Sequence, residues 1–183
     1  ILNFMDAYTP GGAPGWSGTQ EEALQHRSNY RDAIEALRGD YPIEKGTVIY
    51  SPNVQFFRQP EIEIGADNKI FSYEFMNPIA FGVVGAAAYD LRPSSKDAID
   101  LNSPEYETKN KDQIRAIIRV AILEKHDAIV LGPLGGGAFL NPIDRIAGFF
   151  KDVIIEFDGQ IKFIGFPFAY KNKEQNRKIF EET

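Results

Sequence analysis

Two glycine-rich loops, each placed between an apolar run and a helical pattern, constrain the fold of this chain most strongly. The first apolar run is Ile1–Met5, and the breakers in the loop after it are Pro10, Gly11, Gly12, Pro14, Gly15 and Gly18. The second run, Ala128–Leu131, leads into Gly132 and then Gly135–Gly137. A strand, a glycine loop and a helix, used twice in this order, predict an α/β/α sandwich with ligands at the carboxyl ends of the strands.

Periodicity and breaker residues predict the other elements. Helical spacing indicates helices over 19–37, from Thr108 onward and over 172–182. Asn141 with Pro142 predicts a helix start, with the asparagine as N-cap and the proline in the first helical position. The predicted β and loop segments are a strand–turn–strand insert over 45–58, a buried strand over 80–88, an exposed loop over 90–108 and a strand over 161–170.

The composition indicates one globular domain over 1–183, since 183 residues with 43% hydrophobic content can bury a core. A net charge of −6 argues against binding to a nucleic-acid backbone. There are no cysteines, which excludes disulfides and permits a reducing compartment, so a cytoplasmic protein is expected. The longest apolar run, Ile79–Ala88, is too short to span a bilayer. Because the chain begins inside a predicted strand, we expect an N-terminal portion to be missing.

Two adjacent carboxylates, Glu21 and Glu22, stand where the first helical pattern begins. Such a pair would repel a bare phosphate, but it suits a sugar whose hydroxyls and glycosidic oxygen need acceptors and a proton donor. The plainer alternative is a capping box, with Thr19 as N-cap and Glu22 as its N3 partner. The spacing is compatible with both interpretations.

The second loop offers three consecutive glycines, Gly135–Gly137, which is more than a tight turn needs. We therefore favour contact with phosphate over a simple turn, although the loop lacks the Gly-Lys-Ser/Thr ending of a P-loop. Phe139 and Tyr170, each taken alone, are interpreted as core aromatics. The two histidines, His26 and His126, match no metal-ligand spacing.

Taken together, the segments LNF…PGGA-x6-QEE, AIVLGPLGGGAFLNP and FPFAYKN resemble the microbial-type poly(ADP-ribose) glycohydrolases, a branch of the macrodomain fold. The resemblance runs from Ile1 to about Phe180 and is weakest over 40–80. It implies a three-layer α/β/α macrodomain-like sandwich with a mixed central sheet. It also implies hydrolysis of O-glycosidic bonds in poly(ADP-ribose) or ADP-ribosylated proteins, without metal or cofactor. We expect a monomer that binds neither nucleic acid nor membranes.

The resemblance also implies roles for individual residues. Glu22 would be the catalytic acid, and Glu21 would hold the hydroxyls of the distal ribose. Gly135–Gly137 would cradle the diphosphate, Phe139 would pack against the distal ribose, and Tyr170 would lie over the adenine. The complete set of expected substrate-binding residues is Asn3, Asp6, Gly11, Gly12, Gln20, Gly135, Gly136, Gly137, Ala138, Phe139 and Tyr170.

Three departures from the family pattern bear on activity. Ala13 replaces the third glycine of the signature, and Asp6 stands where relatives have Asn or Ser. The acid that usually contacts the adenine, upstream of the first strand, is not in this sequence. These departures leave two alternatives open: an ADP-ribose reader without turnover, and a structural domain with a degenerate pocket.

Overall fold

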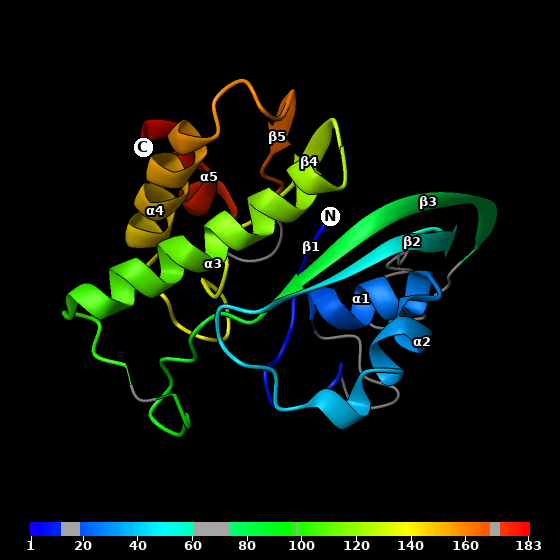
Figure 1. Cartoon of the computed structure of the whole chain (residues 1–183), viewed down its shortest axis with the longest axis horizontal. Coiled ribbons are helices and arrows are strands. Elements are labelled where there is room, and N and C mark those ends of the chain that lie inside the picture. Colours follow the sequence, from blue (N-terminus) through cyan, green and yellow to red (C-terminus); the bar gives the residue numbers. More distant parts are fainter. Residues whose placement is uncertain (12–18, 61–73, 98, 169–172) are drawn as a thin grey trace.

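The structure, a computed structural model, describes residues 1–11, 19–60, 74–97, 99–168 and 173–183 (Figure 1). Its strands are β1 (Leu2–Phe4), β2 (Val48–Arg58), β3 (Phe75–Ala86), β4 (Ala128–Val130) and β5 (Phe163–Gly165). The central strand β3 pairs in parallel with β1 and antiparallel with β2, so this sheet is mixed. β4 and β5 form a separate parallel pair.

Helices lie on both sides of the β1–β3–β2 sheet. They are α1 (Gln20–Arg27), α2 (Tyr30–Glu35), α3 (Pro104–Leu123), α4 (Ile143–Glu156) and α5 (Lys173–Glu182), together with a 3₁₀ turn, η1 (Arg38–Asp40). Figure 1 shows α1 and α2 on one side of β2 and β3, with α3 and α4 on the other. The predicted three-layer α/β/α sandwich with a mixed sheet is therefore confirmed.

Successive side chains of β3 supply the two cores between these layers. Val84 packs into the larger cluster, which α3, α4 and β4 complete, whereas Val83 packs with α1, α2 and β2. Neighbouring residues of a strand point to opposite faces, so an unbroken apolar run is what a strand buried on both faces requires. The predicted buried strand over 80–88 is thus present, although it begins earlier, at Phe75, and ends at Ala86.

The predicted helix over 19–37 is wrong in its continuity, because α1 ends at Arg27 and α2 begins at Tyr30. Ser28 forms a β-bridge with Phe56. Asn29 accepts a hydrogen bond from the backbone N–H of Gln55 through Oδ1 (2.9 Å). These two residues therefore bind the outer edge of β2, and the backbone cannot remain helical there.

The predicted strand–turn–strand insert is also wrong, since β2 is one strand from Val48 to Arg58. Pro52 and Asn53 lie within it, where the pairing register with β3 shifts between Ser51 and Val54. Proline is tolerated there because β2 is an edge strand and the irregular register needs no N–H at that point.

Two helix starts differ from the sequence predictions. α3 begins at Pro104, inside the segment predicted as loop, and Ser103 caps it by accepting a hydrogen bond from the Tyr106 N–H (3.2 Å). α4 begins at Ile143, with Pro142 rather than Asn141 as its N-cap. Of the predicted strand over 161–170, the described residues 161–168 form a strand only in β5, and Pro167 follows shortly after it.

Candidate active site

The first turn of α1 lies against β1 because the Gln20 side chain binds the strand's backbone. Gln20 accepts a hydrogen bond from the Phe4 N–H (2.9 Å) and donates to the Leu2 carbonyl (2.7 Å). The opposite edge of β1 pairs with β3. The glutamine amide therefore satisfies the edge where another strand would otherwise pair, and it fixes the start of α1 beside the end of β1.

Glu21 points into the protein, where it is 4% exposed. Its Oε1 accepts a hydrogen bond from the Asn3 Nδ2 (3.0 Å). Burial raises the pKa of Glu21 to about 7, the Asn3 hydrogen bond opposes this rise, and the charge of Glu22 adds to it. A backbone hydrogen bond from Asp6 also favours the ionised form. Glu21 therefore titrates near neutral pH.

Asn3 is fully buried between Glu21 and Tyr30. Its Nδ2 also lies 3.1 Å from the Tyr30 hydroxyl, so one amide orients both groups. The approach is possible because position 85 is glycine: a Cβ at Gly85 would lie 3.2 Å from the Tyr30 hydroxyl and 2.9 Å from the Met5 sulfur. The structure thus places Asn3 in contact with Glu21 and Tyr30.

Glu22 is 8% exposed and accepts a hydrogen bond from the Thr19 hydroxyl. The Thr19 side chain makes no capping hydrogen bond to the helix, so the capping box considered for these two residues is not formed. Both carboxylates are consequently held in the first turn of α1, where the orphan N–H groups and the helix dipole favour negative charge.

The segment after β1 is shaped by Asp6 and Gly11. Asp6 Oδ1 accepts hydrogen bonds from the backbone N–H groups of Tyr8 (2.6 Å) and Thr9 (3.0 Å), which forms an Asx turn. Gly11 has φ +57°, and a Cβ there would lie 1.8 Å from the Gln25 Nε2. The left-handed backbone at this position favours glycine. The predicted site residues Gly12 and Tyr170, and the departure at Ala13, lie outside the described residues.

The second glycine loop follows β4 and is held by Asn141. Gly135 has φ +73°, and its carbonyl accepts a hydrogen bond from the Asn141 Nδ2 (3.1 Å). The same amide donates to the Tyr89 carbonyl (2.7 Å) and accepts from the Tyr106 hydroxyl (2.7 Å). The Gly136 N–H donates within the loop to Pro133 (2.9 Å). Asn141, which sequence reasoning assigned to a helix cap, instead fixes the loop.

Gly137 and Ala138 in this loop are exposed, and Phe139 follows half-buried. No atom lies within 4 Å of where a Cβ would stand at Gly137. The Phe139 ring lies 5.2 Å from the Arg92 guanidinium and 6.0 Å from the Lys45 ammonium. Arg92, Lys45 and Tyr30 were not recognised from the sequence, because no local pattern marks them.

The second glycine loop begins beside the end of β1. A Cβ at Gly132 would lie 2.6 Å from the Phe4 ring, so the ends of β1 and β4 are in contact. A cavity of about 340 Å³ elsewhere, between α4 and α5, is lined by Phe150, Phe168 and Phe180 among others, and by none of the predicted site residues.

Neither a metal site nor a membrane span is found in the described ranges. No group of three or more His, Asp or Glu side chains there could hold a metal ion. Of the helices described, none is long and apolar enough to cross a membrane.

Comparison with solved structures identifies the fold. The chain is similar to poly(ADP-ribose) glycohydrolase from Thermomonospora curvata (TM-score 0.77, 22% identity, 99% of this chain and 66% of that chain). It is also similar to the same enzyme bound to the inhibitor ADP-HPD (TM-score 0.78, 22% identity, 99% of this chain and 68% of that chain). The Deinococcus radiodurans enzyme in complex with ADP-ribose gives a TM-score of 0.74 at 22% identity, over 99% of this chain and 73% of that chain.

This chain spans about two thirds of the length of the T. curvata structures. No protein-family model and no curated protein sequence matches it. The resemblance stated from the sequence motifs is confirmed by the structural comparison, which covers nearly the whole chain. The chain has the fold of the microbial poly(ADP-ribose) glycohydrolases.

Proposed function

We propose that this chain is an ADP-ribosyl glycohydrolase that cleaves O-glycosidic bonds of poly(ADP-ribose) or of ADP-ribosylated proteins. The observation that carries the proposal is the pair of buried adjacent carboxylates, Glu21 and Glu22, at the end of β1. The D. radiodurans structure of the same fold is a complex with ADP-ribose, which supports this class of ligand. Gly135–Gly137 and Ala138 would cradle the diphosphate, with backbone N–H groups other than that of Gly136, which binds the Pro133 carbonyl, as donors.

In the proposed mechanism Glu22 protonates the leaving oxygen as positive charge develops on the ribose. The ionised Glu22 then takes a proton from the attacking water. Glu21 accepts a hydrogen bond from Asn3, and its pKa of about 7 means that it carries a proton for part of the time at neutral pH. A protonated Glu21 would leave Glu22 without a neighbouring negative charge. Asp6, Gly11 and Gln20 would shape the first loop around the distal ribose.

The test compares the rate at which the wild type and Glu22→Gln release free ADP-ribose from a protein automodified with poly(ADP-ribose). The amide cannot donate the proton, so we expect a rate lower by roughly a hundredfold or more, with ADP-ribose affinity retained. Glu35→Gln is the matched control, because Glu35 is exposed on α2 and pairs with Arg38. Undiminished turnover by a folded Glu22→Gln protein would refute the mechanism. A wild type that binds ADP-ribose but releases none would instead be a reader.

The ligand contacts are tested by comparing ADP-ribose with adenosine. If the second glycine loop recognises diphosphate, adenosine binds far more weakly, and ADP-ribose alone protects Gly135–Phe139 from hydrogen exchange. Equal affinities would mean that this loop is only a turn. Tyr170 is proposed to lie over the adenine, so Tyr170→Ala should lower the affinity for both ADP-ribose and adenosine.

A further inference from the structure

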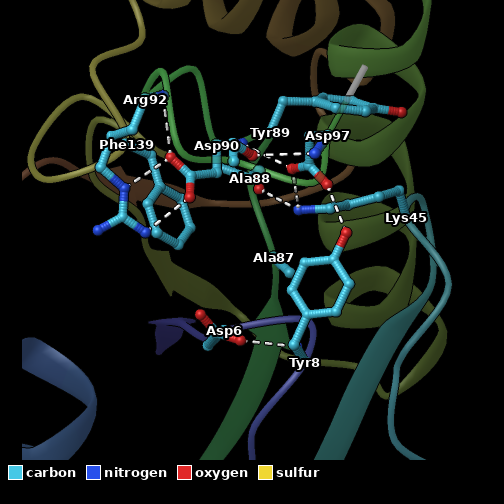
Figure 2. A network of polar contacts seen from close by, with 12 residues as sticks. Asp6, Tyr8, Lys45, Ala87, Ala88, Tyr89, Asp90, Arg92, Asp97 and Phe139 are labelled. Carbon is cyan, nitrogen blue, oxygen red and sulfur yellow. Dashed lines mark hydrogen bonds and ion pairs between the residues drawn. The ribbon is translucent and has the colours of Figure 1, made fainter. Parts of the chain in front are cut away.

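Asp97 is an almost fully buried carboxylate outside the glutamate pair, with a side chain that is 4% exposed. It binds groups from three segments (Figure 2). The Tyr8 hydroxyl donates to Oδ1 (2.8 Å), the Lys45 ammonium lies 2.8 Å from Oδ2, and the Asp90 N–H donates to Oδ2 (2.7 Å). Tyr8 lies in the segment after β1, Lys45 in the segment before β2, and Asp90 in the segment after β3. One side chain therefore joins loops that strand pairing leaves separate.

Asp97 is ionised at neutral pH. Burial alone would raise the pKa of its carboxyl, but the Asp90 N–H, the Lys45 ammonium and the Tyr8 hydroxyl together outweigh burial and hold the pKa below its ordinary value. The hydrogen bond between Tyr8 and Asp97 raises the pKa of Tyr8, so the Tyr8 hydroxyl keeps its proton and remains a donor. Charge-assisted hydrogen bonds of this kind are stronger than neutral ones.

Lys45 connects Asp97 to the second glycine loop. Its ammonium also donates to the Ala88 carbonyl, and it lies 5.5 Å from the Tyr89 ring and 6.0 Å from the Phe139 ring. Only 16% of the side chain is exposed, so its position is set by these partners rather than by solvent. A cation over an aromatic ring is attracted to the ring face.

A second set of contacts positions the Phe139 ring. The Asp90 carboxylate binds the Arg92 guanidinium (2.6 and 2.8 Å), which lies 5.2 Å from the centre of the Phe139 ring. The Leu91 N–H donates to the Phe139 carbonyl (3.0 Å). Figure 2 shows the aromatic ring among these charged groups. The backbone and the ring of Phe139 are thus both fixed by the segment that carries Asp97.

We propose that Asp97 is a positioning residue of the candidate site, which holds the segment after β1 through Tyr8 and the Phe139 ring through Lys45 before any ligand binds. This inference rests on the proposed function, because that function puts both segments against the distal ribose. A site whose loops are fixed in advance spends less of its binding free energy on ordering them. Asp97 itself touches no reacting atom.

The first test needs no ligand. Hydrogen exchange is compared between the wild type, Asp97→Asn and Tyr8→Phe. Asp97→Asn is expected to accelerate exchange over 5–11 and 135–141 while α4 is unaffected, because the amide cannot hold the Lys45 cation. Tyr8→Phe should accelerate exchange only over 5–11. Tyr8 is 40% exposed, so this variant keeps the fold if Asp97→Asn does not. Unchanged exchange in both segments would overturn the proposal.

The second test asks whether Asp97 acts through Phe139. Asp97→Asn should weaken ADP-ribose binding about tenfold, the size expected for losing one charge-assisted hydrogen bond. In a Phe139→Leu background the same substitution should weaken binding less, because the ring that it positions is absent and only the route through Tyr8 remains. A merely stabilising role would lower the melting temperature without this reduction. An undiminished effect in the Phe139→Leu background would refute the route through Phe139.

Tyr50→Phe is the matched control for Tyr8→Phe. Tyr50 also donates or accepts one side-chain hydrogen bond, to His126 (2.7 Å), but His126 follows the far end of α3. Its removal should leave exchange over 5–11 and ADP-ribose affinity unchanged. A wild type that binds no ADP-ribose would refute the proposed function, and the ligand-free exchange comparison would then decide whether Asp97 holds the two segments.

Discussion

Replacing Gly135 with alanine should destabilise the protein, because this position combines a left-handed backbone with two close neighbours. Its φ of +73° costs an alanine about 1–2 kcal/mol. A Cβ there would lie 2.4 Å from the Asn141 Nδ2 and 2.6 Å from the Ala88 Cβ. Moving the Asn141 amide breaks its buried hydrogen bond to the Tyr89 carbonyl and its partly buried one to the Gly135 carbonyl, at about 1–3 kcal/mol.

The gain from restricting the unfolded chain offsets part of this cost, so Gly135→Ala should lose about 2–4 kcal/mol of unfolding free energy. For a chain of this size that is a fall in melting temperature of about 5–15 °C. Gly137→Ala is the control, since nothing lies within 4 Å of its added Cβ. Urea and thermal unfolding of both variants measure the difference. Equal stability of the two would refute the conclusion that Asn141 and the Gly135 backbone hold this loop.

Two further predictions concern the first turn of α1. Burial raises the pKa of Glu21 from 4.5 to about 7, so the folded protein keeps a proton that the unfolded chain releases. The unfolding free energy should therefore fall by about 3 kcal/mol as the pH rises from 4.5 to about 7. Urea unfolding at several pH values measures this fall, which should be absent in Glu21→Gln. Gln20→Met should destabilise the protein by about 2 kcal/mol, because it leaves the Phe4 N–H and the Leu2 carbonyl unpaired. The exposed Gln160→Met should not, and equal unfolding curves for the two would contradict the role of the Gln20 amide.

The elements that could be predicted from the sequence are those whose cause is local. A strand followed by a glycine loop and a helix is visible twice, since apolar runs and glycines are adjacent in the chain. The break between α1 and α2 was missed because its cause is distant. Ser28 and Asn29 leave the helix to bind β2, and nothing beside them in sequence signals that strand.

The same distinction holds for the candidate site. The two glutamates and the second glycine loop form short motifs, so they were found. The Tyr8–Asp97 hydrogen bond joins residues 89 positions apart, and Lys45 comes from a third segment. The position of Asn141 before a proline predicts a helix cap. In the structure its side-chain amide instead donates hydrogen bonds to three loop carbonyls.

The Gln-Glu-Glu triplet shows how three consecutive side chains can perform separate tasks. Neighbouring residues of an α-helix point about 100° apart, which follows from 3.6 residues per turn. Gln20 accordingly reaches the β1 backbone, Glu21 turns inward to Asn3, and Glu22 turns to the Thr19 hydroxyl. The glutamine fixes the rotation of the helix about its axis, and that rotation decides which carboxylate is buried against Asn3. Exchanging the order of the three residues would therefore lose both the anchor and the difference between the two carboxylates, even though the composition of the turn stayed the same.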